Sequence, residues 1–360
     1  MKILKYLLIF IPISFIGEFL KISPSINFIF AALSIIPLAG LMGEATEEIS
    51  FYTGPKVGGF LNSTFGNATE LIISFFALKA GLFDVVKASI VGSVIGNILL
   101  VLGASMFAGG LKFKTQKFNK KIVEVSSSML LFAVIGLSIP AVFTHTLDKS
   151  LISTRYEDFS IFVAAVMFII YILSLVFSFF THKNVYEATE KENDSSLNNT
   201  NEEESEDKNK WSLKKAIAIL AISTVCIAIE SEFLVNGVDA ITSTLGLSDL
   251  FVGIILIPII GNAAEHSTAV SMALKNKMDV SVEIAIGSSL QIILFVTPVL
   301  IFLSLLFKPM SIVFNGFELV SMFLAVLIVN RIASDGESHW LEGFQLLAVY
   351  LIIAAGFFII

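Results

Sequence analysis

Long apolar runs recur along this chain, and they constrain its fold more than any other feature. About 20 such residues in a helix cross the ~30 Å hydrocarbon core of a bilayer. The composition agrees, because 56% of the 360 residues are apolar and only 15% are charged, whereas an average soluble chain is about 25% charged. The sequence therefore predicts an all-α polytopic membrane protein with the lipid bilayer as its surroundings.

Windows of about 19 residues indicate eleven candidate transmembrane segments. They are residues 3–20, 26–43, 57–81, 86–109, 122–144, 159–181, 212–236, 249–275, 280–307, 314–330 and 340–360. The first segment is the shortest and lacks a small-residue cleavage site, so we expect a retained helix rather than a signal peptide. The single cysteine, Cys226, excludes a disulfide framework.

One polar stretch separates the sixth segment from the seventh. Residues 184–210 read NVYEATEKENDSSLNNTNEEESEDKNK, an acidic composition rich in Ser and Asn. Such a composition cannot bury a core, so we expect a solvated linker, with a short acidic helix at residues 185–191 as the alternative. This stretch accounts for the net charge of −7, and nothing in the charge pattern indicates a nucleic-acid partner.

Lysines and arginines are distributed unevenly between alternate loops. If the eleven segments begin inside, 17 of the 23 basic residues lie inside and the other 6 lie outside. The positive-inside rule then places the N-terminus and the acidic linker in the cytosol. We expect an integral protein of a bacterial-type plasma membrane, although this orientation depends on the first segment being a true span.

The chain also repeats itself at a spacing of 195 residues. GNATE at 66–70 matches GNAAE at 261–265, and Asp-Val and Gly-Ser pairs match further along. Because the third segment runs outward and the eighth runs inward, the two copies are inserted in opposite senses. Many secondary transporters use such inverted repeats to build a site at the bilayer midplane. The predicted organisation is an extra helix (1–22), a five-helix repeat (23–181), the linker (182–211) and a second five-helix repeat (212–360).

Each copy carries a glutamate, Glu70 or Glu265, in the middle of an apolar segment. A charge at mid-membrane costs about 2.5–3.5 kcal/mol or more, and the helix backbone gains nothing from it. The alternative is a neutral, hydrogen-bonded acid that holds two helices together. A symmetric pair, accompanied by Gly and Asn at fixed spacing, favours a functional role.

Oxygen-bearing residues accompany these glutamates. Gly66 and Gly261 weaken the helix and can let carbonyl groups turn toward an ion, while Asn67 and Asn262 precede their glutamates by three residues and share a helix face with them.

The following segment of each copy adds a hydroxyl and an amide. These are Ser93 and Asn97 in the first copy, and Ser288 and Gln291 in the second. The alternative for the Gly-Ser pairs is helix packing by small residues, which could be true of the glycines at the same time. Hard oxygen ligands favour calcium over soft transition metals, so we expect calcium as the transported ion and no cofactor.

Other polar residues receive weaker interpretations. His266 is either a proton relay or partner of Glu265, or a packing residue. Glu44, Glu47 and Asp239 are candidate entrance or regulatory residues, which helix-end solvation explains nearly as well. For Glu230, Glu232 and Glu318 we expect pairing with lysines or with interfacial water, and gating is the alternative.

Two carboxylates also set a charge balance. When both are ionised, they neutralise one divalent cation. Without the metal, their repulsion at low dielectric favours uptake of protons. Metal and protons therefore compete for the same oxygens, which is the behaviour of an antiporter rather than an enzyme.

At these residues the sequence resembles the calcium/proton exchangers (the CAX family) of the cation/calcium exchanger superfamily. The resemblance rests on PLAGLMGEATEEIS from Pro37, GNATELI from Gly66, GSVIGNILLVLG from Gly92, GNAAEHSTAV from Gly261, GSSLQI from Gly287 and DGESHWLEG from Asp335. It implies two inverted five-helix repeats after an extra first helix. It also implies calcium export driven by inward proton flow, with Glu70 and Glu265 binding calcium and protons in turn.

Three rival functions stay open at this point. A sodium/calcium exchanger shares the architecture but usually carries a GTSxPE pattern, where this chain has GNATE and GNAAE. A calcium-permeable channel would more often use the symmetry of an oligomer to build its pore. An intramembrane enzyme fits least, because the sequence has no H-E-x-x-H motif. Calcium and protons are the predicted partners, and a homo-oligomer is neither indicated nor excluded.

Overall fold

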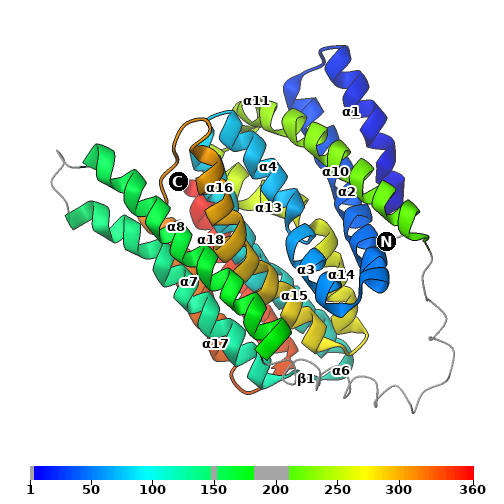
Figure 1. The fold of residues 1–360 in the computed structure, drawn as a ribbon, viewed down its shortest axis with the longest axis vertical. Coiled ribbons are helices and arrows are strands. Elements are labelled where there is room, and N and C mark those ends of the chain that lie inside the picture. The colour runs from blue at the N-terminus through cyan, green and yellow to red at the C-terminus, as the bar shows by residue number, and fades with distance from the viewer. Residues whose placement is uncertain (1–3, 147–151, 182–210) are drawn as a thin grey trace.

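The computed structural model describes residues 4–146, 152–181 and 211–360. Within these ranges the chain is a bundle of packed helices, with one pair of short strands near one end (Figure 1). The acidic linker, including the alternative helix at 185–191, lies outside the described residues.

Helix is present over each of the six predicted segments before the linker. The elements are η1 (Leu4–Ile9), α1 (Phe10–Phe19), α2 (Pro24–Thr53), α3 (Pro55–Phe65), α4 (Ala68–Lys79), α5 (Phe83–Ile95), η2 (Gly96–Val101), α6 (Leu102–Phe113), β1 (Thr115–Lys117), α7 (Lys120–Thr146), α8 (Ile152–Val176) and η4 (Phe177–Thr181). Of these, η1 is a 3₁₀ helix, whereas η2 and η4 are π-helical.

Helix also covers the five predicted segments after the linker. The elements are α10 (Leu213–Asn236), α11 (Val238–Leu245), α12 (Asp249–Phe251), η5 (Val252–Leu256), α13 (Ile257–Gly261), α14 (Ala263–Leu274), α15 (Met278–Gln291), η6 (Ile292–Val296), α16 (Thr297–Ser304), α17 (Gly316–Ile332), β2 (Glu337–His339) and α18 (Trp340–Ile359). Here η5 and η6 are π-helical.

Seven helices in the described part of the chain are long and apolar enough to cross a membrane. An eighth is formed if Val238–Leu245 and Asp249–Gly261, which meet at an angle of 115°, count as one bent span. The protein is therefore an all-α polytopic membrane protein, as predicted, and the count of eleven spans stays a prediction.

The two motif segments are not continuous helices. The first is interrupted at Gly66 and Asn67, between α3 and α4, and the second is interrupted at Asn262, between α13 and α14. Each glutamate consequently lies in the first turn of a half-helix rather than in the middle of a long one. The broken form follows from Gly and Asn, which are poor helix formers and leave the backbone free to turn.

The helices form three groups. Helices α1, α2 and α10 pack on one another at one side of the bundle, and α7, α8 and α17 lie at the other side (Figure 1). Between these groups lie α4, α13, α14 and α15 (Figure 1). The motif helices thus lie in the middle of the bundle, where contacts to α2 and α10 meet contacts to α15.

Candidate cation site

Glu70 and Glu265 occupy equivalent places in their half-helices. Each is the third residue of its helix, α4 or α14, and each follows an asparagine at the N-cap position. The positive end of a helix dipole stabilises a carboxylate in this first turn. Glu70 is buried, with 5% of its surface exposed, whereas Glu265 is half-buried.

The two copies meet through their glycines. A Cβ added to Gly261 would lie 2.9 Å from Oε1 of Glu70, and a Cβ added to Gly66 would lie 3.3 Å from Oε1 of Glu265. Each carboxylate therefore packs against the glycine of the other copy.

The asparagines also bond across the copies. Ser288 Oγ donates to Asn67 Oδ1 at 2.8 Å, and Asn262 Nδ2 donates to Ser93 Oγ at 3.3 Å. Residue 67 is matched with 262 in the repeat, and 93 with 288, so these two bonds are reciprocal. Reciprocal contacts are what a two-fold relation between two copies produces.

Two further amides complete this network. Asn67 Nδ2 donates to Gln291 Oε1 at 2.5 Å, and Asn97 Nδ2 donates to Ser288 Oγ at 3.0 Å. Neither N-cap asparagine caps its half-helix through its side chain, and Asn262 Nδ2 also donates to the carbonyl of Pro258 on α13 at 3.0 Å. The residues predicted from sequence as ion ligands are thus brought together between the two half-helix junctions.

Several oxygens in this site have no hydrogen-bond donor. Glu70 Oε2, Glu265 Oε2 and Asn262 Oδ1 are buried without a hydrogen-bond partner. Leaving a buried polar atom unsatisfied costs about 1–3 kcal/mol, and more for a charged group. A cation or a proton would satisfy these oxygens.

Neutral oxygens make up the rest of the site. Across residues 4–146, 152–181 and 211–360, no group of three or more His, Cys, Asp or Glu side chains converges as a metal cluster. The site therefore combines two carboxylates with amide and hydroxyl groups. Such a set suits a hard cation with a flexible ligand shell.

The two Gly-Ser motifs differ in what their glycines do. A Cβ on Gly92 would overlap the backbone of Ile254, so this glycine permits α5 and η5 to cross closely. Gly287, its match in the other copy, has open space where a Cβ would be. The packing alternative is therefore correct for Gly92 and wrong for Gly287.

His266 follows Glu265 on α14 and is half-buried. Its Nε2 atom is buried without a hydrogen-bond partner, so the structure provides it with no bond to a glutamate, and the relay role stays a prediction. Glu44 and Glu47 lie in the second half of α2, and Asp239 lies in the first turn of α11. An entrance role for these three acids also stays a prediction.

Three other acids have partners that test the earlier interpretation. Glu232 forms an ion pair with Lys79 at 3.8 Å, as predicted. Glu318 is buried in a capping box with Asn315 at the start of α17. The prediction is wrong for Glu230, which is fully buried and accepts a 2.6 Å hydrogen bond from Ser14 on α1.

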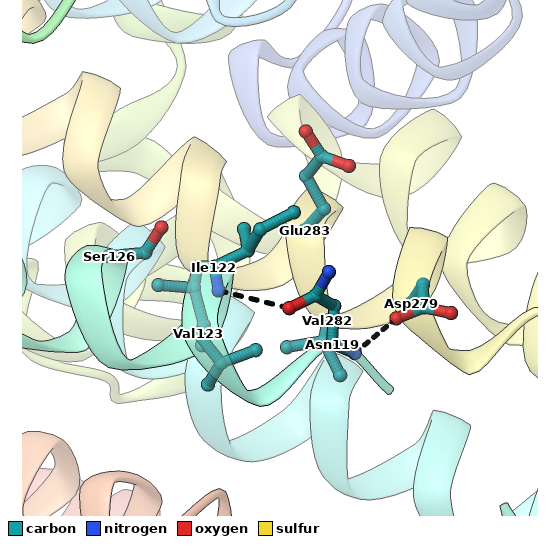
Figure 2. Close-up of a pocket in the computed structure, with 8 residues that line it drawn as sticks. Asn119, Ile122, Val123, Ser126, Asp279, Val282 and Glu283 are labelled. Atoms are coloured by element: carbon teal, nitrogen blue, oxygen red, sulfur yellow. Dashed lines mark hydrogen bonds between the residues drawn. The ribbon is translucent and has the colours of Figure 1, made fainter. Parts of the chain in front are cut away.

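A separate pocket lies between the start of α7 and α15, and neither Glu70 nor Glu265 is among the residues that line it (Figure 2). It is lined by Asn119, Ile122, Val123, Ser126, Asp279, Val282, Glu283 and Ile286. Figure 2 shows the backbone N–H of Asn119 bonded to Asp279, at 2.5 Å. In the sequence repeat Asp279 is the match of Asp84, and no signal in the sequence indicates this pocket.

Burial differs between the two half-helices that carry the glutamates. Seven of the 12 residues of α4 are buried, but only Ala269 and Ala273 are buried among the 12 of α14. The exposed positions of α14 include the hydroxyl-bearing Ser267, Thr268 and Ser271. Exposed hydroxyls beside the half-buried carboxylate of Glu265 are more typical of a water-filled cavity than of a lipid-facing surface.

Fold and sequence together define a polytopic membrane protein of the transporter class, with a candidate cation site where its two motif segments meet. The family model described as "Sodium/calcium exchanger protein" matches residues 24–180 and 215–359, one range in each half. The chain belongs to this family, and the resemblance to the calcium/proton exchangers is confirmed by its relatives. As a member of a transporter family, it is not expected to be an enzyme.

Those relatives align over almost the whole chain. A Ca(2+)/H(+) antiporter of Aphanothece halophytica is 48% identical, with 98% of this chain and 95% of the relative covered. The Ca(2+)/H(+) antiporter ChaA of Bacillus subtilis is 44% identical, with 97% of each chain covered. Among solved structures, native YfkE has a TM-score of 0.84 at 40% identity, covering 99% of this chain and 100% of that one.

Proposed function

We propose that this protein exports calcium from the cytosol in exchange for protons, by alternating access to one site between its two halves. The observation that carries the proposal is the reciprocal placement of Glu70 and Glu265. Each lies against the glycine of the other copy, and each has one oxygen without a donor. The antiporter names of relatives at 44–48% identity support the same substrates.

Calcium would bind to the carboxylates of Glu70 and Glu265, with amide and hydroxyl oxygens around them. Calcium accepts 6–8 oxygen ligands in a flexible arrangement, and two carboxylates balance its charge. The asparagines are already held in place by Ser93 and Ser288. Their oxygens would therefore be oriented before the ion arrives.

Protons would compete for the same carboxylate oxygens. A site that holds either one calcium or a proton on each carboxylate carries no net charge. An empty site would instead hold two buried negative charges, whose desolvation costs several kcal/mol per ion. The halves would then reorient only when the site is loaded, and this restriction couples the two fluxes.

The side from which the site is open follows from the packing of α14. Its exposed hydroxyl-bearing face leads from Glu265 toward the end of the helix at Leu274. The distribution of basic residues between alternate loops favours a cytosolic position for this end of α14. We infer that the structure represents a form open to the cytosol, in which α4 and α13 close the opposite side.

A sodium/calcium exchanger is the second candidate, because the family model that matches the chain is described as "Sodium/calcium exchanger protein". Holding several monovalent ions would be helped by additional carboxylates. Here Asn97 and Gln291 supply neutral amides, bonded to Ser288 and Asn67. This donor set favours protons over sodium as the coupling ion.

The test is calcium uptake into proteoliposomes under an imposed pH gradient. We expect uptake that follows the pH gradient, proceeds without sodium and stops when the gradient is collapsed. Uptake that requires a sodium gradient would establish the second candidate. Flux far above exchanger rates and insensitive to either counter-ion would indicate a channel.

A further inference from the structure

The C-terminal end of α14 is held by side chains from a distant part of the sequence. Gln116 Nε2 donates to the carbonyl of Ala273 at 2.9 Å and to Asn276 Oδ1 at 3.0 Å. Lys112 Nζ donates to the carbonyl of Leu274 at 2.8 Å. The last carbonyls of a helix have no partner within the helix. The carbonyl of Ala273 also accepts from the backbone N–H of Asn276 at 3.0 Å, so Gln116 adds a second bond there and Lys112 supplies one to Leu274.

Gln116 is built into the fold rather than displayed on a loop. It is the middle residue of β1 and is 1% exposed, while its two neighbours on the strand are exposed. Strand β1 pairs antiparallel with β2, with Gln116 opposite Ser338. On its other side, the Gln116 side chain fills the space that a Cβ on Gly109 would take. The amide is therefore fixed before it reaches α14.

The other half of the protein lacks this arrangement. The loop at residues 305–315, which follows α16 as β1 follows α6, contains no strand. It reaches α4 through an aromatic contact between Phe75 and Phe307, with ring centroids 5.9 Å apart. The polar attachment thus belongs to the half-helix that carries Glu265, at the side we infer to be open.

Helix α14 also packs on α6, α15 and α2, but only Ala269 and Ala273 are buried along it. We propose that Gln116 is a positioning residue, which sets the place of Glu265 by holding the far end of α14. The proposal rests on the proposed function, because it assigns Gln116 a part in calcium binding. Loss of the Gln116 donor lets the helix tilt, and Glu265 then moves relative to Glu70.

The main variant is Gln116→Glu, which keeps the size of the side chain but replaces the donor by an acceptor facing two oxygens. The matched control is Lys117→Ala, on the same strand but exposed. Hydrogen–deuterium exchange of the peptide spanning residues 268–278 reports the attachment directly. Calcium uptake in proteoliposomes gives KM and maximal rate separately.

We expect exchange of this peptide to be about 3- to 10-fold faster in Gln116→Glu, as loss of one or two hydrogen bonds predicts. The apparent KM for calcium rises by a similar factor, while the maximal rate stays within about two-fold. Lys117→Ala changes neither. Unaltered exchange, or faster exchange with an unaltered KM, would overturn the proposal.

A second variant covers the case in which Gln116→Glu fails to fold. Lys112→Met keeps the apolar stem of an exposed side chain and removes the bond to Leu274. It should change exchange and KM in the same direction, and no change in either would overturn the proposal. If the parent protein carries no calcium, the proposed function fails, and the exchange measurement still decides whether Gln116 holds α14.

Discussion

Oε1 of Glu70 lies 2.9 Å from the point where a side chain on Gly261 would begin. The carboxylate of the first copy thus occupies the space that a residue with a Cβ would claim in the second copy. This contact joins the two half-helix junctions. Gly261 contributes to the candidate site because it has no side chain and so leaves room for the Glu70 carboxylate.

The substitution Gly261→Ala should therefore displace Glu70. A real Cβ essentially never lies this close to another heavy atom, so the carboxylate must move. We expect a rise of about ten-fold or more in the KM for calcium, since lost ligand geometry of about 1.4 kcal/mol corresponds to that factor. Calcium uptake measures it. The control is Gly287→Ala, which has open space around it and should transport as the parent does.

Gly92→Ala should reduce stability. Its Cβ would overlap the backbone of Ile254, where a shift of side chains alone cannot make room. Overpacking of this kind costs about 1–3 kcal/mol or more. The melting temperature in detergent should fall for Gly92→Ala and stay constant for Gly287→Ala. Equal stability of the two variants would show that α5 and η5 do not cross this closely.

Ser288→Ala should weaken calcium binding more than Ser93→Ala. Ser288 bonds to both Asn67 and Asn97, at 2.8 and 3.0 Å, whereas Ser93 accepts one longer bond from Asn262. Loss of two bonds of about 1 kcal/mol each predicts roughly a ten-fold or larger effect for Ser288. Calcium titration of both purified variants measures it, and an equal effect would contradict the asymmetry of the network.

His339 should give the protein a pH-dependent contribution to stability. Its hydrogen bond with Glu342, at 3.0 Å, raises the pKa of this histidine. A raised pKa in the folded state stabilises the fold fully below the unfolded pKa of about 6.5. The contribution is lost as the pH rises through the folded value. Melting temperatures across this window should fall with rising pH in the parent and fall less in His339→Gln.

The sequence was sufficient to predict the membrane class, and the residues that it proposed as ligands lie together in the structure as a candidate site. Carboxylates in apolar surroundings are costly, so a matched pair of them stands out without a structure. The breaks that divide the motif segments into half-helices were harder to predict from the sequence, although Gly66 and Asn67 are poor helix formers and indicate the first of them. What the sequence could not provide is the difference between equivalent positions, such as Gly92 and Gly287, because only the crossing of α5 with η5 distinguishes them.

Two residues were missed or misjudged for a similar reason. Gln116 lies in the polar stretch KFKTQKFNK, where its composition indicates a solvated loop, and only the pairing of β1 with β2 buries it. Glu230 looked like an acid near an interface. Its partner, Ser14, is 216 residues away in the sequence, so no local pattern could indicate the bond.

Loss of either carboxylate should abolish exchange. Glu70→Gln and Glu265→Gln keep the shape of the side chain but replace the carboxylate by a neutral amide. The amide supplies no negative charge to balance calcium, and it neither takes up nor releases a proton near neutral pH. Both variants should insert and fold, and neither should carry calcium under a pH gradient. Glu232→Gln, at an exposed ion pair with Lys79, is the control. Normal transport by Glu70→Gln or Glu265→Gln would exclude that residue from the site.

The most direct measurement is the release of protons when calcium binds to the purified protein in weakly buffered solution. We expect calcium to displace protons, with more released per calcium at lower pH and with calcium affinity falling as the pH falls. The double variant Glu70→Gln, Glu265→Gln should release none. Calcium binding without proton release, or unchanged release by the double variant, would contradict a shared carboxylate site for the two ions.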